Sequence, residues 1–419
     1  MVSPREFDGR QATACQMCAG TNLRLVLDLG MHPPSDAFLK ELPPQGDETL
    51  YPLRLVSCGE CGLLQIDYRV PPEVLYGGYY VYESSTTATG RAHFTHMAQD
   101  VVKRFAIPPQ SLALDIGSNV GVLLGGFKEA GLNVLGVDPA KRPAEKAIAN
   151  GIPTIVDFFS SAIAERILRE YGPAMVITGT NVFAHLHELD DATGAMKKLL
   201  APEGVIVIEA PYAVDLIEHL EYDTIYLEHI GYLSLKPMAR YFTRFGLELF
   251  DFMKVSIHGG SIRYFVGHAG AHAVSPKIAE GIAEEEAGGL YALPKLKEFA
   301  SRVEKQREEL RALLADLKKK GKRIVGISAP AKGTTLLNYC GIDTNLLDFL
   351  TEKNLAKVGC FTPGTHIPIY DDARLLEEPV DYGLILAWNF AEEIMKNMAD
   401  FRSRGGKFII PIPTPRIID

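Results

Sequence analysis

Two Cys-x-x-Cys pairs near the N-terminus constrain this chain more than any other feature. They are Cys15/Cys18 and Cys58/Cys61, and they account for four of the six cysteines in 419 residues. Four thiolates in two such pairs form the ligand set of a closed, tetrahedral structural zinc site. The gap between the pairs is longer than in a zinc ribbon, so we expect an insert over residues 25–55 to loop out. Two disulfides are the alternative use of the same four thiols.

The N-terminal sequence favours the metal over disulfides. Residues 1–10 are polar and no apolar segment follows them, unlike a secretory signal. No run approaches the ~20 apolar residues that span a bilayer, so we expect no membrane partner. A reducing cytoplasm is the predicted setting, in which Cys340 and Cys360 pack as small hydrophobes. The formal net charge of −9 argues against a general nucleic-acid binder, which would carry a basic stripe.

Apolar runs and helical patterns alternate along most of the chain and divide it into four segments. Residues 1–75 carry the cysteines and are predicted to form the zinc-binding module. Residues 76–270 and 321–419 each alternate strands with helices, which implies parallel sheets with crossover helices. Residues 271–320 are predicted to be a helical connector, interrupted at Pro294. The predicted fold class is therefore α/β, with a small N-terminal zinc-binding module, a central Rossmann-like domain and a smaller C-terminal Rossmann-like domain.

The clearest chemical signal is the stretch LALDIGSNVG at Leu112–Gly121, an apolar strand that runs into a turn opening a helix. Gly117 permits a tight turn, and Gly121 lets a ligand approach the helix start. A second strand ends about twenty residues later in Asp138, a position where an acid commonly hydrogen-bonds a ribose diol. Asn119 stands where the dinucleotide fingerprint has a glycine, so the pattern favours S-adenosylmethionine (SAM) over NAD. An ordinary tight turn with a surface aspartate is the structural alternative.

Other residues are placed to complete a SAM pocket. Asp115 lies at the end of the first strand, next to the glycine turn. Asp157 and Phe158 follow a short strand, where an acid and an aromatic ring could hold an adenine; core packing explains Phe158 and Phe159 equally well. Asn181 follows the strand AMVITGT, at the carboxyl edge where ligands of open α/β sheets bind.

Three polar groups follow the cofactor signature and suggest proton abstraction beside SAM. They are His185; Tyr226, Glu228 and His229; and His258, Gly260 and Arg263. A glutamate beside a histidine can hold the charge of the imidazole, and a tyrosine can donate to a developing oxyanion. A lone histidine is more often structural or solvated, so the argument rests on the three groups together.

The chain resembles the zinc-containing sugar C-methyltransferases, in particular the nucleotide-linked 4-keto-6-deoxyhexose 3-C-methyltransferases. The blocks that carry the resemblance are the two cysteine pairs, GYYVYESS, DIGSNVG, DFF, NVFAHL, YLEHIGY, HGGSIR, TLLNYCGI and FTPGTHIPI. The resemblance implies an N-terminal zinc module, a central SAM-binding domain and a C-terminal α/β domain, with the sugar bound between the lobes. It also implies SAM and a deoxythymidine-diphosphate sugar as ligands, and methylation of the carbon next to a ketone.

The same resemblance implies site residues. It carries the cofactor role onto Gly117, Asn119, Asp138, Asp157 and Asn181, and the active-site role onto His185, Tyr226, Glu228, His229 and either Tyr80 or Tyr82. We expect His229, paired with Glu228, to take the C3 proton, because a neutral imidazole can accept it and then be charge-stabilised. Tyr226, His185 or one of the two earlier tyrosines would donate to the enolate oxygen.

A strand-to-helix turn in the last segment is a candidate for binding the diphosphate. It reads GISAPAKGTT and contains Lys332, which suits a phosphate together with backbone N–H groups. Members of the family tend to show Gly-Ala-x-Ala-Lys here, whereas this chain has Ser-Ala-Pro-Ala-Lys-Gly. Asn338 lies in the following TLLNYCGI block and is a further candidate for substrate binding. A structural turn with an exposed lysine is the alternative.

Two other functions fit the same sequence. One is a SAM-dependent O- or N-methyltransferase acting on a sugar or another small metabolite. The other is a non-catalytic zinc scaffold that retains a SAM fold. Guanosine and cytidine are alternatives to thymidine as the nucleotide, and a monomer is expected because the chain carries its own domain partners.

Overall fold

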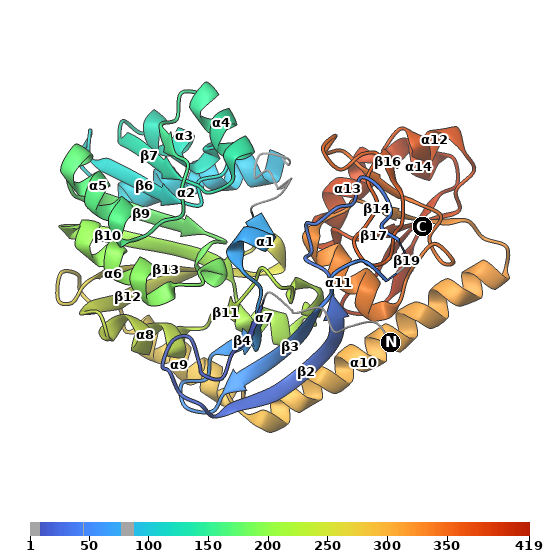
Figure 1. Ribbon diagram of the computed structural model, residues 1–419, viewed down its shortest axis with the longest axis horizontal. Helices are drawn as coiled ribbons and strands as arrows, with labels where there is room; N and C mark the ends of the chain where they lie inside the picture. The colour runs from blue at the N-terminus through green and yellow to red at the C-terminus, as the bar shows by residue number, and fades with distance from the viewer. Residues whose placement is uncertain (1–8, 45, 77–87) are drawn as a thin grey trace.

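The computed structural model describes residues 9–44, 46–76 and 88–419, with only the backbone of His258 (Figure 1). Tyr80 and Tyr82 lie outside the described residues. Figure 1 shows two lobes, one containing the central domain and one the C-terminal domain, with strands β2 and β3 and the long helix α10 running between them.

The N-terminal module is built on a four-stranded antiparallel sheet in the order β11-β4-β3-β2. Its strands are β2 (Leu23–His32), β3 (Tyr51–Cys58), β4 (Leu64–Ile66) and β11 (Gly231–Tyr232). A two-stranded ladder of β1 (Arg10–Gln11) and β5 (Tyr68–Arg69) and the short helix α1 (Pro72–Tyr76) complete it. Only the two ends of the insert expected over residues 25–55 belong to strands, β2 and β3, where alternate residues such as Leu53 and Leu55 are buried, and residues 33–50 lie between these strands.

The central domain has a seven-stranded sheet in the order β12-β13-β10-β9-β6-β7-β8. The strands are β6 (Leu112–Ile116), β7 (Asn133–Val137), β8 (Thr154–Ile155), β9 (Ala174–Thr180), β10 (Leu200–Pro211), β12 (Leu247–Val255) and β13 (Ser261–His268). Five strands are parallel as predicted. β13, however, pairs antiparallel with both β10 and β12, and β12 was not predicted as a strand. The fully buried run of β6 is typical of a strand covered on both faces.

Seven helices belong to the described part of the central segment. They are α2 (Ala88–Arg104), α3 (Val122–Glu129), α4 (Lys141–Ala149), α5 (Ser161–Tyr171), α6 (Leu189–Leu199), α7 (Ala213–Glu218) and α8 (Leu235–Thr243). Short 3₁₀ turns lie at Phe183–His185, Tyr222–Thr224 and Ile257–Gly259.

The connector is two helices, α9 (Lys277–Ala287) and α10 (Leu293–Lys319). Pro294 stands in the first turn of α10, where a missing N–H costs nothing, so the break precedes the proline. The buried residues of α10 recur every three or four positions, from Leu296 and Phe299 to Leu314 and Leu317. They belong to one hydrophobic cluster that also contains residues of the N-terminal sheet and of the C-terminal domain.

The C-terminal domain has a six-stranded sheet in the order β16-β15-β14-β17-β18-β19, parallel except for its last pair. Its strands are β14 (Ile324–Ile327), β15 (Leu350–Glu352), β16 (Ile369–Asp371), β17 (Tyr382–Ile385), β18 (Lys407–Ile410) and β19 (Arg416–Ile418). Its helices are α11 (Ala331–Cys340), α12 (Arg374–Glu377), α13 (Ala391–Asn397) and α14 (Ala399–Ser403), with a 3₁₀ turn at Trp388–Phe390. Cys340 and Cys360 are buried thiols, as expected. Among the described residues, no helix is both long and apolar enough to cross a membrane.

Candidate active site

The two cysteine pairs lie on turns with the same backbone pattern. In each turn the N–H of the residue after the second cysteine donates to the carbonyl of the first, Ala19 to Cys15 and Gly62 to Cys58, both at 2.9 Å. Ala19 and Gly62 both have positive φ, 58° and 89°. Because the two turns share this geometry, each can direct both of its thiols towards one metal ion.

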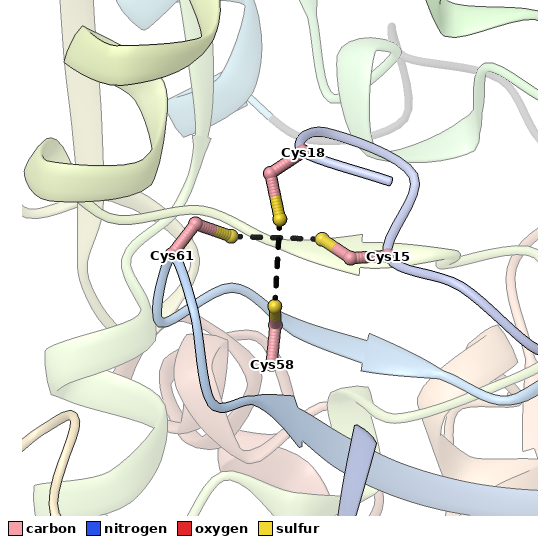
Figure 2. A group of neighbouring side chains, drawn as sticks. All are labelled: Cys15, Cys18, Cys58 and Cys61. Atoms are coloured by element: carbon pink, nitrogen blue, oxygen red, sulfur yellow. Dashed lines mark hydrogen bonds between the residues drawn. The ribbon is translucent and has the colours of Figure 1, made fainter. Parts of the chain in front are cut away.

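The four sulfurs converge on one point (Figure 2). All four Sγ atoms lie within 4.8 Å of one another, and the Cys15–Cys61 and Cys18–Cys58 sulfurs are 3.5 Å apart. Four thiolates about 2.3 Å from a zinc ion stand roughly 3.8 Å apart, so the group fits tetrahedral zinc. All four thiols are free of disulfides. A set of four cysteine ligands leaves no position for substrate, and the zinc is therefore structural.

A cavity of about 440 Å³ lies between the two lobes, with walls from all three parts of the chain. Asp36 comes from the N-terminal module, the β6–α3 turn comes from the central domain, and Lys332 and Lys357 come from the C-terminal domain. Most of the predicted cofactor and catalytic residues line it. These are Asp115, Gly117, Asn119, Asp138, Phe158, Asn181, His185, Tyr226, Glu228 and His229.

The glycine turn after β6 depends on Gly117. Its φ is +69°, and a Cβ there would come within 2.3 Å of Val182 Cγ2. The absent side chain therefore lets the turn pack against the segment that follows β9. Gly121 has φ +79° and precedes the first residue of α3, as expected of a turn that opens a helix.

Two buried carboxyl groups face the cavity beside this turn. Asp138 accepts from the N–H groups of Asn119 and Ala140, at 2.7 and 2.8 Å, so it fixes the loop that it faces. Asp115 accepts from the Thr178 hydroxyl at 2.6 Å, and burial raises its pKa to about 7. With the Oδ1 atom of Asn181, which has no hydrogen-bond partner among the described residues, this end of the cavity is rich in acceptors. SAM presents an ammonium group and ribose hydroxyls as donors, so the residues present fit it.

The same cavity is lined by an imidazole–phenol pair. Tyr226 and His229 share a 2.7 Å hydrogen bond between the phenol oxygen and Nε2, and Nδ1 lies 2.9 Å from the carbonyl of Thr224. Because a carbonyl can only accept, Nδ1 carries the proton of a neutral His229, and Nε2 accepts from Tyr226. This arrangement holds His229 in the tautomer that a general base needs.

A second histidine packs against the first. The ring centroid of His185 is 4.6 Å from that of His229, and its Nδ1 lies 2.8 Å from the phenol oxygen of Tyr76. Burial, helped by the nearby His229, holds the pKa of His185 well below its usual range. His185 is thus a neutral imidazole at neutral pH, able to donate from one nitrogen.

Glu228 is buried and linked to the N-terminal module. Its Oε1 accepts from the backbone N–H groups of Ser35 and Asp36, at 2.9 and 3.4 Å. Burial, followed by the charge of Asp36, raises its pKa to about 8. In the described part of the chain Glu228 holds an N-terminal loop, whereas both nitrogens of His229 bond elsewhere. This corrects the expected pairing of Glu228 with His229.

Lys332 lines the cavity at the start of α11. Its ammonium lies 3.7 Å from the ring centroid of Trp388, and its Nζ has no hydrogen-bond partner among the described residues. Burial lowers its pKa to about 8, while the charges of Asp223 and Glu221 act in the opposite direction. Lys332 can therefore present a positive charge to a ligand at neutral pH.

Several predicted ligand-binding residues lie away from the cavity wall. Asp157 is exposed, and its carboxylate accepts from the N–H of Phe158. Arg263 lies opposite Glu209 in the β10–β13 ladder and is buried in an ion pair with it, at 2.8 Å. Gly260 is followed by β13 and packs beside Asp215, and Asn338 donates to the carbonyls of Thr334 and Pro363.

Three residues of the cavity were missed from the sequence. Tyr76 lies two positions before the GYYVYESS block, and that position was its one signal. Asp36 and Lys357 stand 321 positions apart and meet only in the folded chain, at 3.4 Å. Neither belongs to a motif, so no local pattern could have identified them.

Three family models match, described as "Putative zinc binding domain" over residues 15–76, "Methyltransferase domain" over 91–251 and "C-methyltransferase C-terminal domain" over 256–413. The C-methyltransferase NovU of Streptomyces niveus is 35% identical over 410 residues, which cover 98% of this chain and 97% of that protein.

Solved structures resemble the chain over less than half its length. A SAM-dependent methyltransferase from Clostridium acetobutylicum covers 43% of this chain and 92% of its own, at 13% identity and a TM-score of 0.35. Magnesium protoporphyrin IX methyltransferase from Synechocystis, solved with bound SAM, covers 46% of this chain and 88% of its own, at 12% identity and a TM-score of 0.33. The chain is 35% identical to NovU over nearly its whole length, and three family models match it. It therefore belongs to the C-methyltransferases that join a zinc-binding domain to a SAM-dependent methyltransferase domain.

Proposed function

We propose that this C-methyltransferase methylates C3 of a nucleotide-linked 4-keto-6-deoxyhexose. The observation that carries the proposal is the Tyr226–His229 pair, which faces the same cavity as the SAM-binding turn. C-methylation requires a carbon nucleophile, and a base beside a ketone is the means of making one. The resemblance to sugar 3-C-methyltransferases supports the choice of substrate.

Four residues of the central domain are proposed to hold the cofactor. Asp115, Asp138 and Asn181 would accept from the donors of SAM, and Gly117 keeps the turn close to it. Bound there, SAM supplies an electrophilic methyl group on a positively charged sulfonium. Positioning the substrate carbon is then the main task left to the protein.

The Tyr226–His229 pair is proposed to remove the C3 proton. The C4 ketone acidifies this proton, and the phenol oxygen of Tyr226 takes it while its own proton passes to Nε2 of His229. The resulting imidazolium keeps its Nδ1–H bonded to the carbonyl of Thr224. The electron pair of the C–H bond moves into the enolate, so protons and charge balance.

The enolate oxygen needs a donor. His185 is our candidate, because Tyr76 can donate to its Nδ1 and leave Nε2–H available. Tyr80 and Tyr82 remain candidates through the resemblance alone. Lys332 is proposed to contact the diphosphate, with thymidine as the preferred nucleotide and guanosine or cytidine as alternatives.

The test is turnover of purified protein with SAM and a panel of nucleotide-linked 4-keto-6-deoxyhexoses, read by mass and carbon NMR. The expected product gains one methyl on C3. Without SAM, the protein is expected to exchange the C3 proton for solvent deuterium. Methyl gain on oxygen or nitrogen, or the absence of both turnover and exchange with every sugar, would contradict the proposal.

A further inference from the structure

The segment that follows β2 brings the zinc-binding module into the cavity. Residues 33–39, the 33–39 loop, lie between β2 and β3, and Asp36 of this loop is a wall residue of the cavity. Its side chain is 11% exposed. An acid buried this far against an open cavity is costly unless a partner or a ligand compensates its charge.

The backbone of the 33–39 loop holds Glu228. The N–H groups of Ser35 and Asp36 both donate to Oε1 of Glu228. Glu228 is 3% exposed, lines the cavity, and its Oε2 has no hydrogen-bond partner in the part of the chain that the structure describes. One oxygen of this carboxyl is therefore held by the loop, and the other is buried without a partner among the described residues.

The side chain of Asp36 pairs with Lys357 of the C-terminal domain. Their charged atoms are 3.4 Å apart, and both residues line the cavity. The Lys357 ammonium also donates to the Ala329 carbonyl at 2.8 Å and lies 4.3 Å from the ring centroid of Phe38. Lys357 is thus fixed in place from both sides, by the 33–39 loop and by the β14–α11 turn.

The 33–39 loop is further joined to the C-terminal domain at both of its ends. The Thr334 hydroxyl donates to the Ser35 carbonyl at 2.9 Å. Leu39 and Phe361 exchange two backbone hydrogen bonds, at 3.0 and 2.7 Å. A loop anchored in this way is positioned precisely enough to contact a substrate.

Two carboxyl groups, those of Asp36 and Glu228, and the ammonium group of Lys357 thus lie together in the cavity wall. Carboxyl oxygens accept from hydroxyl or ammonium groups, and an ammonium donates to oxygen. We infer that Asp36 is a specificity-determining residue that the zinc-binding module contributes to the active site. Asp36 binds a hydrogen-bond-donating group of the sugar, and Lys357 holds Asp36 in place. This inference rests on the proposed function, because it takes the sugar as the ligand of Asp36.

The experiment compares Asp36→Ala with the wild-type protein. The substitution removes the carboxylate but keeps the backbone N–H that holds Glu228. We expect the KM for the sugar to rise about 10- to 100-fold, as for the loss of a hydrogen bond to a charged group, with a smaller change in kcat. The Kd for SAM should stay within about 2-fold of the wild type, since the side chain of Asp36 pairs with Lys357 of the C-terminal domain and not with the glycine turn. Glu41→Ala is the matched control, an exposed acid of the same module.

Asp36→Asn separates the two kinds of sugar donor. A sugar hydroxyl can still donate to the amide oxygen, so the loss would be smaller than with alanine; an ammonium group would lose about as much in both variants. An unchanged KM in Asp36→Ala would overturn the inference. So would a parallel loss of SAM affinity and melting temperature, which would mean that Asp36 acts only on folding. If wild-type protein binds no nucleotide sugar by calorimetry, the proposed function fails first, and the inference fails with it.

Discussion

The two ends of the cavity are built in opposite ways. The cofactor end comes largely from one stretch of chain between Asp115 and Asp138, and it consists of a glycine turn, Asp138 held by nearby backbone and Asp115 held by Thr178. The catalytic end collects side chains from the N-terminal module, the central domain and the C-terminal domain, among them Asp36, His229 and Lys357. A substitution at the cofactor end should therefore affect SAM binding alone. The geometry of the catalytic end, in contrast, depends on how the domains pack together.

This difference also separates the residues that bind SAM from those proposed to act on the substrate. SAM is a large, common ligand, and a strand–turn–helix unit can hold it with little help from the rest of the fold. Thr224 sets the tautomer of the Tyr226–His229 pair within one short segment. Glu228 of the same segment, however, is held by the amides of Ser35 and Asp36 from the N-terminal module. A substrate-specific site thus requires contacts that no single segment can make.

The largest expected effect comes from removing the imidazole. His229→Asn keeps a donor near the position of Nδ1 but deletes Nε2, which accepts from Tyr226. We expect kcat to fall about 10²- to 10⁴-fold, the range for loss of a general base. C3 deuterium exchange should fall in proportion, while the Kd for SAM, measured by calorimetry, stays unchanged. His96→Asn, on the exposed face of α2, is the control. Equal loss of SAM binding would show that the two ends are not separable.

A smaller effect is expected on how stability depends on pH. The pKa of Glu228 is raised from 4.5 to about 8 by burial, so the folded protein binds this proton more tightly than the unfolded chain. Its contribution is fully present below about pH 4.5 and is lost as pH rises towards 8, by up to about 1.4 kcal/mol per pH unit. Glu228→Gln should remove that component, so its Tm should fall less than that of the wild type between pH 5 and 8.

Melting curves at several pH values check this prediction. Glu129→Gln, at an exposed position of α3, should follow the wild-type pH dependence. If the wild type and Glu228→Gln lose stability in parallel, Glu228 is ionised at neutral pH, and its link to the 33–39 loop is an ordinary charged contact.

The smallest effect tests the cofactor end by itself. Asp138→Asn replaces one of the oxygens that accept from Asn119 and Ala140 with a donor, and should weaken SAM binding about 10-fold. Asp157→Asn is the matched substitution at an acid that is exposed and outside the cavity wall, and should change the Kd for SAM less than 2-fold. If both variants lost SAM affinity equally, Asp157 would belong to the cofactor site, as the sequence predicted.

The sequence was most informative where functional residues form short motifs. The cysteine pairs predicted the four-sulfur cluster, and the LALDIGSNVG stretch predicted the turn at Gly117. The sequence was least informative where a residue's partner depends on strand pairing or on other long-range contacts. Arg263 looked like a ligand donor beside two glycines, but the unpredicted antiparallel register places it against Glu209. Glu228 looked like a partner of His229 because it precedes it, yet the chain turns the two side chains towards different neighbours.

The sequence by itself determined the metal site, the order of the α/β units and the family, because each rests on short-range spacing or on a pattern of apolar residues. The tertiary structure alone decided that Asp36 of the zinc-binding module meets Lys357 and Glu228 in the cavity. Such a contact depends on how α10 and the N-terminal sheet pack between the two lobes (Figure 1). Packing of that kind is set by the sum of many buried side chains, and no local motif encodes it.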